Sequence, residues 1–343
     1  MFIRLGAPAV VAAVLAAVVG ISGCAAVSSL SPASHGGTQY ASVGQPQTPL
    51  ADACSTKACI YVSDRYVNAI TVYTKGAHGD ASPIRTITGA ATALNQPIGM
   101  ALDSSRALHV AEFGANSVAV FAPGANGNVA PTKTIVGSNT LLNGADFVTV
   151  DASGKSYVVN WTGASIETFA AGANGNVAPT KIIAGSNTKM FEPLCVVLDA
   201  RKELIVTSTG NSSVFVYAQG VHGNVAPIRT ISGSNTGLFG PGGLALDSAG
   251  EIYVTNYSGN SVTVYPQNAN GNVAPIRSIV GTNTGLDTPV EVSFDRSGKI
   301  YVVNRDGNSV NVYPANANGN VAPLHTITGM HTLLQSPAGM ALH

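Results

Sequence analysis

From about residue 59 onward, short apolar runs alternate with polar turn segments, and no stretch has the length and periodicity of an amphipathic helix. Residues 223–270 contain four such runs, APIRTIS, GGLALD, EIYVTN and SVTVY. They are rich in Val, Ile, Thr and Tyr, which are enriched in strands. Asn-Gly dipeptides such as Asn270-Gly271 favour tight turns. The pattern therefore predicts four short antiparallel strands in this stretch.

The same pattern recurs along the chain. The pentapeptide Gly-Asn-Val-Ala-Pro begins at residues 127, 175, 223, 271 and 319, so the period is 48 residues. Five complete units span 79–318. Residues 59–78 match only the second half of a unit, and residues 319–343 match only the first half. Four strands per repeat at a period in this range are typical of a β-propeller blade.

The two half units predict how the ring closes. We expect residues 338–343 to form the innermost strand of a blade whose other strands are 59–64, 68–74 and 82–88. Main-chain hydrogen bonds between the two ends would then close the array. The prediction is an all-β, six-bladed β-propeller with four antiparallel strands per blade, in which both termini contribute to one blade.

The repeat resembles the NHL type. Residues 242–265, GGLALD…GEIYVTNYSGNSVTVY, have its Gly-containing inner strand ending in Asp, its second strand, and an Asn before the third strand. The resemblance covers 59–343 and implies a propeller, but it does not imply one function. Related six-bladed propellers include gluconolactonase-type and paraoxonase-type metal hydrolases, an antibiotic-opening lyase has a similar seven-bladed ring, and others are interaction modules.

The first 24 residues have the pattern of an export signal. Arg4 precedes an apolar stretch, residues 7–20, that is short for a membrane span. The stretch leads into ISGC, residues 21–24, which resembles the lipobox of bacterial lipoproteins. This resemblance implies that Cys24 is diacylated and becomes the mature N-terminus. Ala25, where an Asp would favour the inner membrane, indicates the outer membrane or cell surface. An ordinary secretory signal or an anchor helix is the alternative.

Three parts are therefore expected: a signal peptide (1–24), a flexible tether (25–53) rich in Ser, Gly, Pro, Gln and Ala, and the propeller (54–343). In an exported protein, Cys54 and Cys59 are close enough in sequence to form a disulfide, and two free thiols are the alternative. Cys195 lies in an apolar run and is expected to be buried.

Composition and motifs exclude several functions. The 17 basic residues are balanced by 17 acidic residues, whereas a nucleic-acid-binding surface needs a basic excess. We therefore expect no nucleic-acid partner. The sequence has no Gly-rich phosphate loop, no Gly-x-Ser-x-Gly elbow and no His-Glu-x-x-His motif. No catalytic constellation is predicted.

Positions that recur in most units are expected to serve the fold. One such column follows the inner strand, and we expect it to accept turn hydrogen bonds rather than form a metal ring. A second column is basic and lies on the outermost strand. Its preferred interpretation is protection of the sheet edge, and a belt for anionic lipid or glycan is the alternative. The two columns are Asp103, Asp151, Asp199, Asp247 and Asp295, and Arg85, Lys133, Lys181, Arg229, Arg277 and His325.

Positions that differ between units are candidates for ligand binding. The turn between the second and third strands is expected to open on the same face as the loop before the inner strand. Aromatic and Arg side chains around one mouth suit a protein, peptide or glycan ligand. Ordinary solvent-exposed loops are the alternative. The variable column of the turn is Arg65, Phe113, Trp161, Thr209, Tyr257 and Arg305.

Three acidic residues depart from their columns. Asp146 and Glu291 stand where other inner strands carry small or apolar residues, and Glu112 replaces the Asn/Ser/Asp column that includes Asn160, Ser208, Asn256 and Asn304. Together with an Asn of that column, they could hold Ca²⁺ or another divalent cation through oxygen ligands. Two hypotheses follow. The preferred one is a membrane-anchored lipoprotein with a propeller that binds a ligand without a cofactor, and the alternative is a divalent-metal-dependent hydrolase, lactonase or lyase.

Overall fold

The computed structural model describes Cys54 and residues 58–343. Of the two compact units, Met1–Thr48 and Pro49–His343, only the second contains described residues. The predictions for the signal peptide, for Cys24 and for the tether lie outside the described residues. In the part that is described, no helix combines the length and the apolar character needed to cross a membrane.

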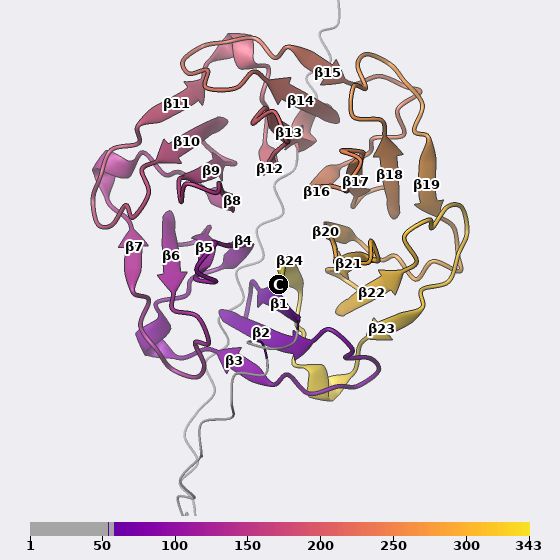
Figure 1. Ribbon diagram of the computed structural model, residues 1–343, viewed down its shortest axis with the longest axis horizontal. Helices are drawn as coiled ribbons and strands as arrows, with labels where there is room; N and C mark the ends of the chain where they lie inside the picture. Colours follow the sequence, from indigo (N-terminus) through magenta and orange to yellow (C-terminus); the bar gives the residue numbers. More distant parts are fainter. Residues whose placement is uncertain (1–53, 55–57) are drawn as a thin grey trace, which may run out of the picture. The chain divides into compact units, whose positions relative to one another are not determined.

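The described chain forms six four-stranded antiparallel sheets, arranged as blades around a ring (Figure 1). This confirms the predicted six-bladed propeller. From the innermost strand outward, blade 1 consists of β24 (Pro337–Leu342), β1 (Cys59–Asp64), β2 (Ala69–Thr74) and β3 (Arg85–Ile87). Blade 2 consists of β4 (Pro97–Leu102), β5 (Leu108–Glu112), β6 (Ser117–Phe121) and β7 (Lys133–Ile135). Blade 3 consists of β8 (Ala145–Val150), β9 (Ser156–Asn160), β10 (Ser165–Phe169) and β11 (Lys181–Ala184).

The other three blades have the same order. Blade 4 consists of β12 (Pro193–Leu198), β13 (Leu204–Ser208), β14 (Ser213–Tyr217) and β15 (Arg229–Ile231). Blade 5 consists of β16 (Pro241–Leu246), β17 (Ile252–Asn256), β18 (Ser261–Tyr265) and β19 (Arg277–Val280). Blade 6 consists of β20 (Pro289–Phe294), β21 (Ile300–Asn304), β22 (Ser309–Tyr313) and β23 (His325–Ile327). Short 3-10 helices are η1 (Ala90–Thr92), η2 (Ser138–Thr140), η3 (Ser186–Thr188), η4 (Thr209–Asn211) and η5 (Met330–Thr332).

The ring is closed by the two ends of the described chain. Strand β24 pairs with β1 in the register Tyr61↔Ala341 and Val62↔Met340, and His343 N donates to Cys59 O at 3.1 Å. The predicted shared blade is therefore confirmed. The disulfide between Cys54 and Cys59 is also present.

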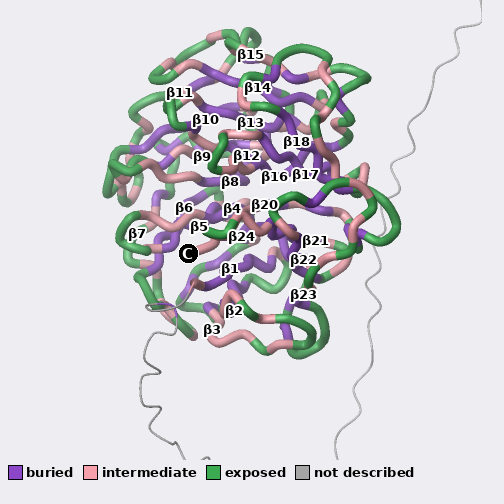
Figure 2. The backbone as a smooth tube through the Cα atoms, turned by 45° about the vertical axis from the view of Figure 1, so that its right-hand side comes forward, coloured by how far each residue is buried: buried purple, intermediate pink, exposed green. Residues whose placement is uncertain are grey.

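The second and third strands of the blades are buried along almost their whole length, as the purple stretches of Figure 2 show. Neighbouring blades cover both faces of these strands, so nearly every position can be apolar. The outermost strands are shorter and partly exposed. The packing between blades thus explains why the sequence shows continuous apolar runs rather than strict alternation.

The repeated Gly-Asn-Val-Ala-Pro segment joins each blade to the preceding one. Gly127 N donates to Thr86 O at 2.7 Å, and Asn128 Oδ1 accepts from Ala91 N at 2.7 Å. Gly127 has φ 74°, a left-handed conformation that glycine adopts easily. At the closing junction Asp80 replaces the Asn, and its carboxylate binds both the backbone N–H and the ring of His331.

The ring has two faces that differ in their turns. On the face that we name the Asp-turn face, the inner strands end and the second strands begin. There Asp103 Oδ1 accepts from Ser105 N at 2.8 Å and from Ala107 N at 2.9 Å. Corresponding bonds at Asp151, Asp199, Asp247 and Asp295 confirm the predicted turn role. The opposite face, where the inner strands begin, is the mouth face.

Candidate ligand-binding mouth

Each inner strand has an irregular start on the mouth face. In blade 3 the register shifts between Ala145 and Phe147, and in blade 4 it shifts between Pro193 and Val196. The pairing of the other four inner strands shifts at the equivalent point. A bulge re-aims the side chains beside it. These shifts therefore turn residues of the inner strands toward the centre of the ring.

The re-aimed residues surround a cavity of about 80 Å³. All six blades contribute, and three members of the variable turn column reach the same cavity. The lining consists of Ile98, Asp146, Phe147, Leu194, Cys195, Gly242, Gly243, Val290, Glu291 and Ala338 from the inner strands, with Arg65, Tyr257 and Arg305 from the turns.

Glycines on the inner strands make room for two of the larger lining side chains. A Cβ at Gly99 would lie 2.3 Å from Cδ2 of Phe147, and a Cβ at Gly243 would lie 2.6 Å from Cα of Glu291. Each glycine faces the inner strand of the next blade. The alternation of small and large residues around the ring therefore shapes the cavity.

The variable turn residues contact one another along the rim. The Arg65 guanidinium lies 4.7 Å from the ring centroid of Phe113, which in turn is 6.1 Å from the centroid of Trp161. On the other side, the Arg305 guanidinium is 5.8 Å from the Tyr257 centroid. Arg65, Tyr257 and Arg305 line the cavity, whereas Phe113 and Trp161 extend the rim away from Arg65.

Asp146 and Glu291 face the cavity from strands of opposite blades, β8 and β20 (Figure 1). Only 7% of Asp146 and 4% of Glu291 is exposed. Burial raises the pKa of Asp146 to about 7, although the charge of Arg65 acts to lower it. Burial also raises the pKa of Glu291 well above its usual range, and the charge of Asp146 acts in the same direction. Burial in the cavity therefore favours the protonated forms of the Asp146 and Glu291 carboxyl groups.

Glu112 does not line this cavity. Its Oε2 accepts from Asn95 N at 2.6 Å, and Asn160 Oδ1 accepts from Asn143 N in the same way. Glu112 thus performs the structural role of the Asn/Ser column that it replaces. The structure brings Asp146 and Glu291 to one cavity without Glu112, and the described residues contain no group of three His, Cys, Asp or Glu side chains that could hold a metal ion.

Sequence reasoning missed two other buried carboxyl groups. Burial raises the pKa of Asp64 and of Glu167 to about 7. Glu167 accepts from Ser165 Oγ at 2.7 Å and also bonds the Asn160 amide. The signal was present, because Glu167 is the single acid in its column of the repeat. Cys195 is buried, as predicted, and it also lines the cavity.

Comparisons with known proteins support the fold. No family model matches the chain, and no curated protein sequence matches it. Solved structures are similar at low identity. A chain of a nidogen/laminin complex has a TM-score of 0.60 at 16% identity, covering 83% of this chain and 98% of that chain. A putative 6-phosphogluconolactonase from Bacteroides uniformis has a TM-score of 0.57 at 13% identity, covering 84% and 99%.

A streptogramin B lyase has a TM-score of 0.55 at 13% identity, and the match covers 82% of each chain. These three similar proteins have different names, and the identities are low. The likeness therefore establishes the class, a β-propeller, and leaves the function to be argued from the mouth.

Proposed function

We propose that the protein is an exported bacterial lipoprotein whose NHL-like propeller is a binding scaffold, with its ligand seated on the mouth face. The observation that carries the proposal is the convergence of Arg65, Tyr257 and Arg305 on one central cavity. These positions vary between otherwise similar blades, so the fold itself does not require them. The lipobox-like ISGC at residues 21–24 supports export and lipid attachment at the outer membrane or cell surface.

The chemistry of the rim favours a peptide, protein or glycan. Phe113 and Trp161 offer flat apolar surfaces, and Arg65 beside them offers hydrogen-bond donors. Phe191 and Phe239, in the loops that precede β12 and β16, are 56% and 62% exposed and add apolar surface on the same face. A ligand that places an apolar or flat group on these rings and an acceptor group on the arginines fits this arrangement.

The test is binding of the purified chain to arrays of peptides and oligosaccharides. Replacing Trp161 and Tyr257 with Ala should weaken binding of any captured ligand about tenfold or more, because rigid aromatic anchors dominate interface energies. Leu324→Ala is the matched control, since Leu324 is 53% exposed and directly precedes β23, an outermost strand, away from the mouth face. Equal affinities of the double variant and the wild type would contradict the proposed mouth.

A second candidate is a divalent-metal-dependent hydrolase, lactonase or lyase, and one observation favours it. Asp146 and Glu291 line the same cavity, so both could offer oxygen ligands to Ca²⁺ or a similar cation. Their partial ligand set would need backbone carbonyls or water to complete it. Metal analysis of the purified protein, with thermal unfolding before and after chelation, tests this candidate. A metal-free protein whose unfolding is unchanged by chelator and by added Ca²⁺ would rule it out.

A further inference from the structure

Basic residues gather on the Asp-turn face. Its turns contain Lys75, Arg106, Lys155, Arg201, Lys202, Arg296 and Lys299, and the outermost strands begin at the same level with Arg85, Lys133, Lys181, Arg229 and Arg277. The basic residues outnumber the acidic residues of this face, which are the five turn Asp residues, Glu203 and Glu251. The mouth face carries only Arg65, Lys189 and Arg305 among the described Lys and Arg residues. The balanced charge of the whole chain therefore conceals a basic surface.

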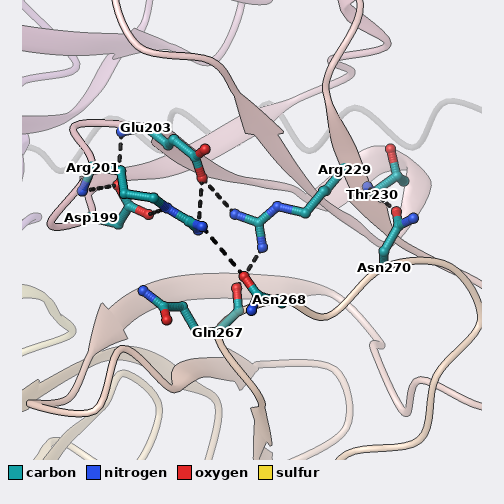
Figure 3. Close-up of polar contacts among 8 residues, drawn as sticks. All are labelled: Asp199, Arg201, Glu203, Arg229, Thr230, Gln267, Asn268 and Asn270. Carbon is teal, nitrogen blue, oxygen red and sulfur yellow. Dashed lines mark hydrogen bonds and ion pairs between the residues drawn. The ribbon is translucent and has the colours of Figure 1, made fainter.

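Part of this positive charge is neutralised by ion pairs within the propeller. In blade 4, Glu203 Oε2 accepts from Arg201 at 3.0 Å and from Arg229 at 2.6 Å (Figure 3). Arg201 also pairs with Asp199 at 3.1 Å. Two arginines pair with two carboxylates in the cluster of Figure 3, so the cluster has no net charge. It therefore does not reduce the positive charge of the surrounding lysines.

Six basic residues of the face make no ion pair with any carboxylate that the structure describes. Five of them are exposed and Lys299 is half-buried; the six are Lys133, Lys155, Lys181, Lys202, Arg296 and Lys299. Three of these lysines, Lys155, Lys181 and Lys202, line one groove of about 240 Å³ between blades 3 and 4. Asp151 also lines the groove, but its carboxylate accepts from the backbone N–H groups of Ser153 and Lys155. Lys181 Nζ donates to Gly220 O. Three ammonium groups against one carboxylate leave the groove with a positive charge that suits a phosphate group.

The chain enters the propeller at this same face. Cys54, the first described residue, is bonded to Cys59 at the start of β1. Arg106 Nη1 donates to Cys54 O at 3.5 Å, and Arg85 Nη2 donates to Cys54 Sγ at 3.0 Å. The segment that leads back to Cys24 therefore joins the propeller at the basic surface and not at the mouth.

We infer that the Asp-turn face docks on an anionic lipid surface, through the unpaired lysines around the groove between blades 3 and 4, and thereby directs the mouth away from the membrane. This inference rests on the proposed lipid attachment at Cys24. A random-coil segment of the length of residues 25–53 has an end-to-end distance of about 30 Å. Attachment at that distance keeps the basic face close to lipid headgroups, so weak contacts are strengthened by proximity.

An anionic polysaccharide is the competing ligand for such a face. The position of Cys54 favours lipid, because the chain end that would carry the acyl groups enters the propeller on the same basic face, next to Arg85 and Arg106. Lysines near an anionic bilayer each contribute to attraction that falls off within a Debye length. A polysaccharide would gain nothing from the position of the chain entry.

The experiment uses the chain from residue 24 with Cys24→Ser, so that no acyl group anchors it. We expect it to sediment with vesicles of equal parts phosphatidylcholine and phosphatidylglycerol, and not with phosphatidylcholine alone. Lys202→Gln should lower the partition coefficient about fivefold. The matched control is Lys189→Gln, an exposed lysine at the other end of β12, which should change nothing. The triple variant of Lys155, Lys181 and Lys202 to Gln should lower it about a hundredfold.

The single tryptophan, Trp161, reports orientation because it lies on the mouth rim. On vesicles with brominated acyl chains, its fluorescence should stay unquenched and remain accessible to acrylamide. The docking inference is overturned by equal binding to both vesicle types, by equal effects of the Lys202 and Lys189 variants, by quenching of Trp161, or by binding to an anionic polysaccharide but not to vesicles. Lipid attachment is read separately from the mass of the wild-type protein extracted from membranes, so its failure is distinguishable.

Discussion

At the end of every second strand, one polar side chain accepts a backbone N–H from the loop before an inner strand. Most blades use Asn or Ser for this purpose, as in Asn256 Oδ1 accepting from Phe239 N at 3.0 Å. Blades 1 and 2 use the acids Asp64 and Glu112. Burial raises the pKa of Glu112 to about 8, and its Oε1 has no hydrogen-bond partner among the described residues. An acid at this position is costly in its charged form.

The raised pKa of Glu112 predicts a dependence of stability on pH. The native state binds this proton more tightly than the unfolded chain does, so the contribution is fully present below the unfolded pKa of 4.5 and is lost as the pH rises through about 8. The free energy of unfolding should therefore fall between pH 5 and pH 8. Glu112→Gln, which keeps the acceptor for Asn95 N, should reduce this fall by about 1–3 kcal/mol in urea titrations.

Asp295 serves as a control, because its pKa is shifted in the opposite direction to that of Glu112. Burial acts to raise the pKa of Asp295, but Lys75 and the hydrogen bonds of its turn together lower it to about 2. Its stabilising contribution is present above the unfolded pKa and is lost only as the pH falls toward 2. Asp295→Asn should destabilise the protein equally at pH 5 and pH 8. If Glu112→Gln shows the same flat difference, the assignment of a raised pKa to Glu112 is wrong.

At the level of strands, the sequence pattern predicted the position of a strand correctly where burial determines that position. The second and third strands match their apolar runs, because neighbouring blades cover both of their faces. The outermost strand of blade 1 was predicted at 82–88 but spans only Arg85–Ile87. Residues 82–84 precede the strand, although Ile84 N still donates to Val72 O at 2.8 Å within the blade. Farther upstream, Gly79 N donates to Thr326 O at 2.7 Å in the neighbouring blade. A contact with another blade cannot be read from the local pattern.

The same limit explains what was and was not predicted at the mouth. Arg65, Tyr257 and Arg305 were found because they vary between repeats, and the geometry brings them to one cavity. Glu112 was assigned to a metal site because of its residue type, whereas its backbone partner Asn95 became visible only in three dimensions. Which inner-strand residue faces the centre depends on a bulge, and no repeat comparison locates a bulge.

The closing strand offers a test at this scale. A Cβ at Gly339 would lie 2.1 Å from the backbone oxygen of Ile98 in the next blade, so the backbone itself would have to move. Gly339→Ala should lower the free energy of unfolding by about 1–3 kcal/mol in urea titrations, because overpacking of a rigid contact is costly. Gly76→Ala is the matched control, with no atom within 4 Å of the added carbon. Equal stability of the two variants would show that β24 does not pack against β4 as described.

For the whole molecule, closure of the ring determines which residues become neighbours at the mouth. Arg65 follows β1 in blade 1, and Arg305 follows β21 in blade 6. They come to the same cavity only because β24 joins the two ends of the chain in one sheet. The separation of a variable mouth from a basic Asp-turn face has the same origin, because each blade repeats one orientation around a closed ring.

Hydrogen exchange followed by mass spectrometry tests this closure most directly. If β24 is the innermost strand of blade 1, the amides of residues 338–343 should exchange as slowly as those of the equivalent strand β8 in blade 3, since both pair with a buried second strand. Exchange in residues 338–343 as fast as that of the exposed turn residues 152–155 would contradict a ring sealed by its own termini.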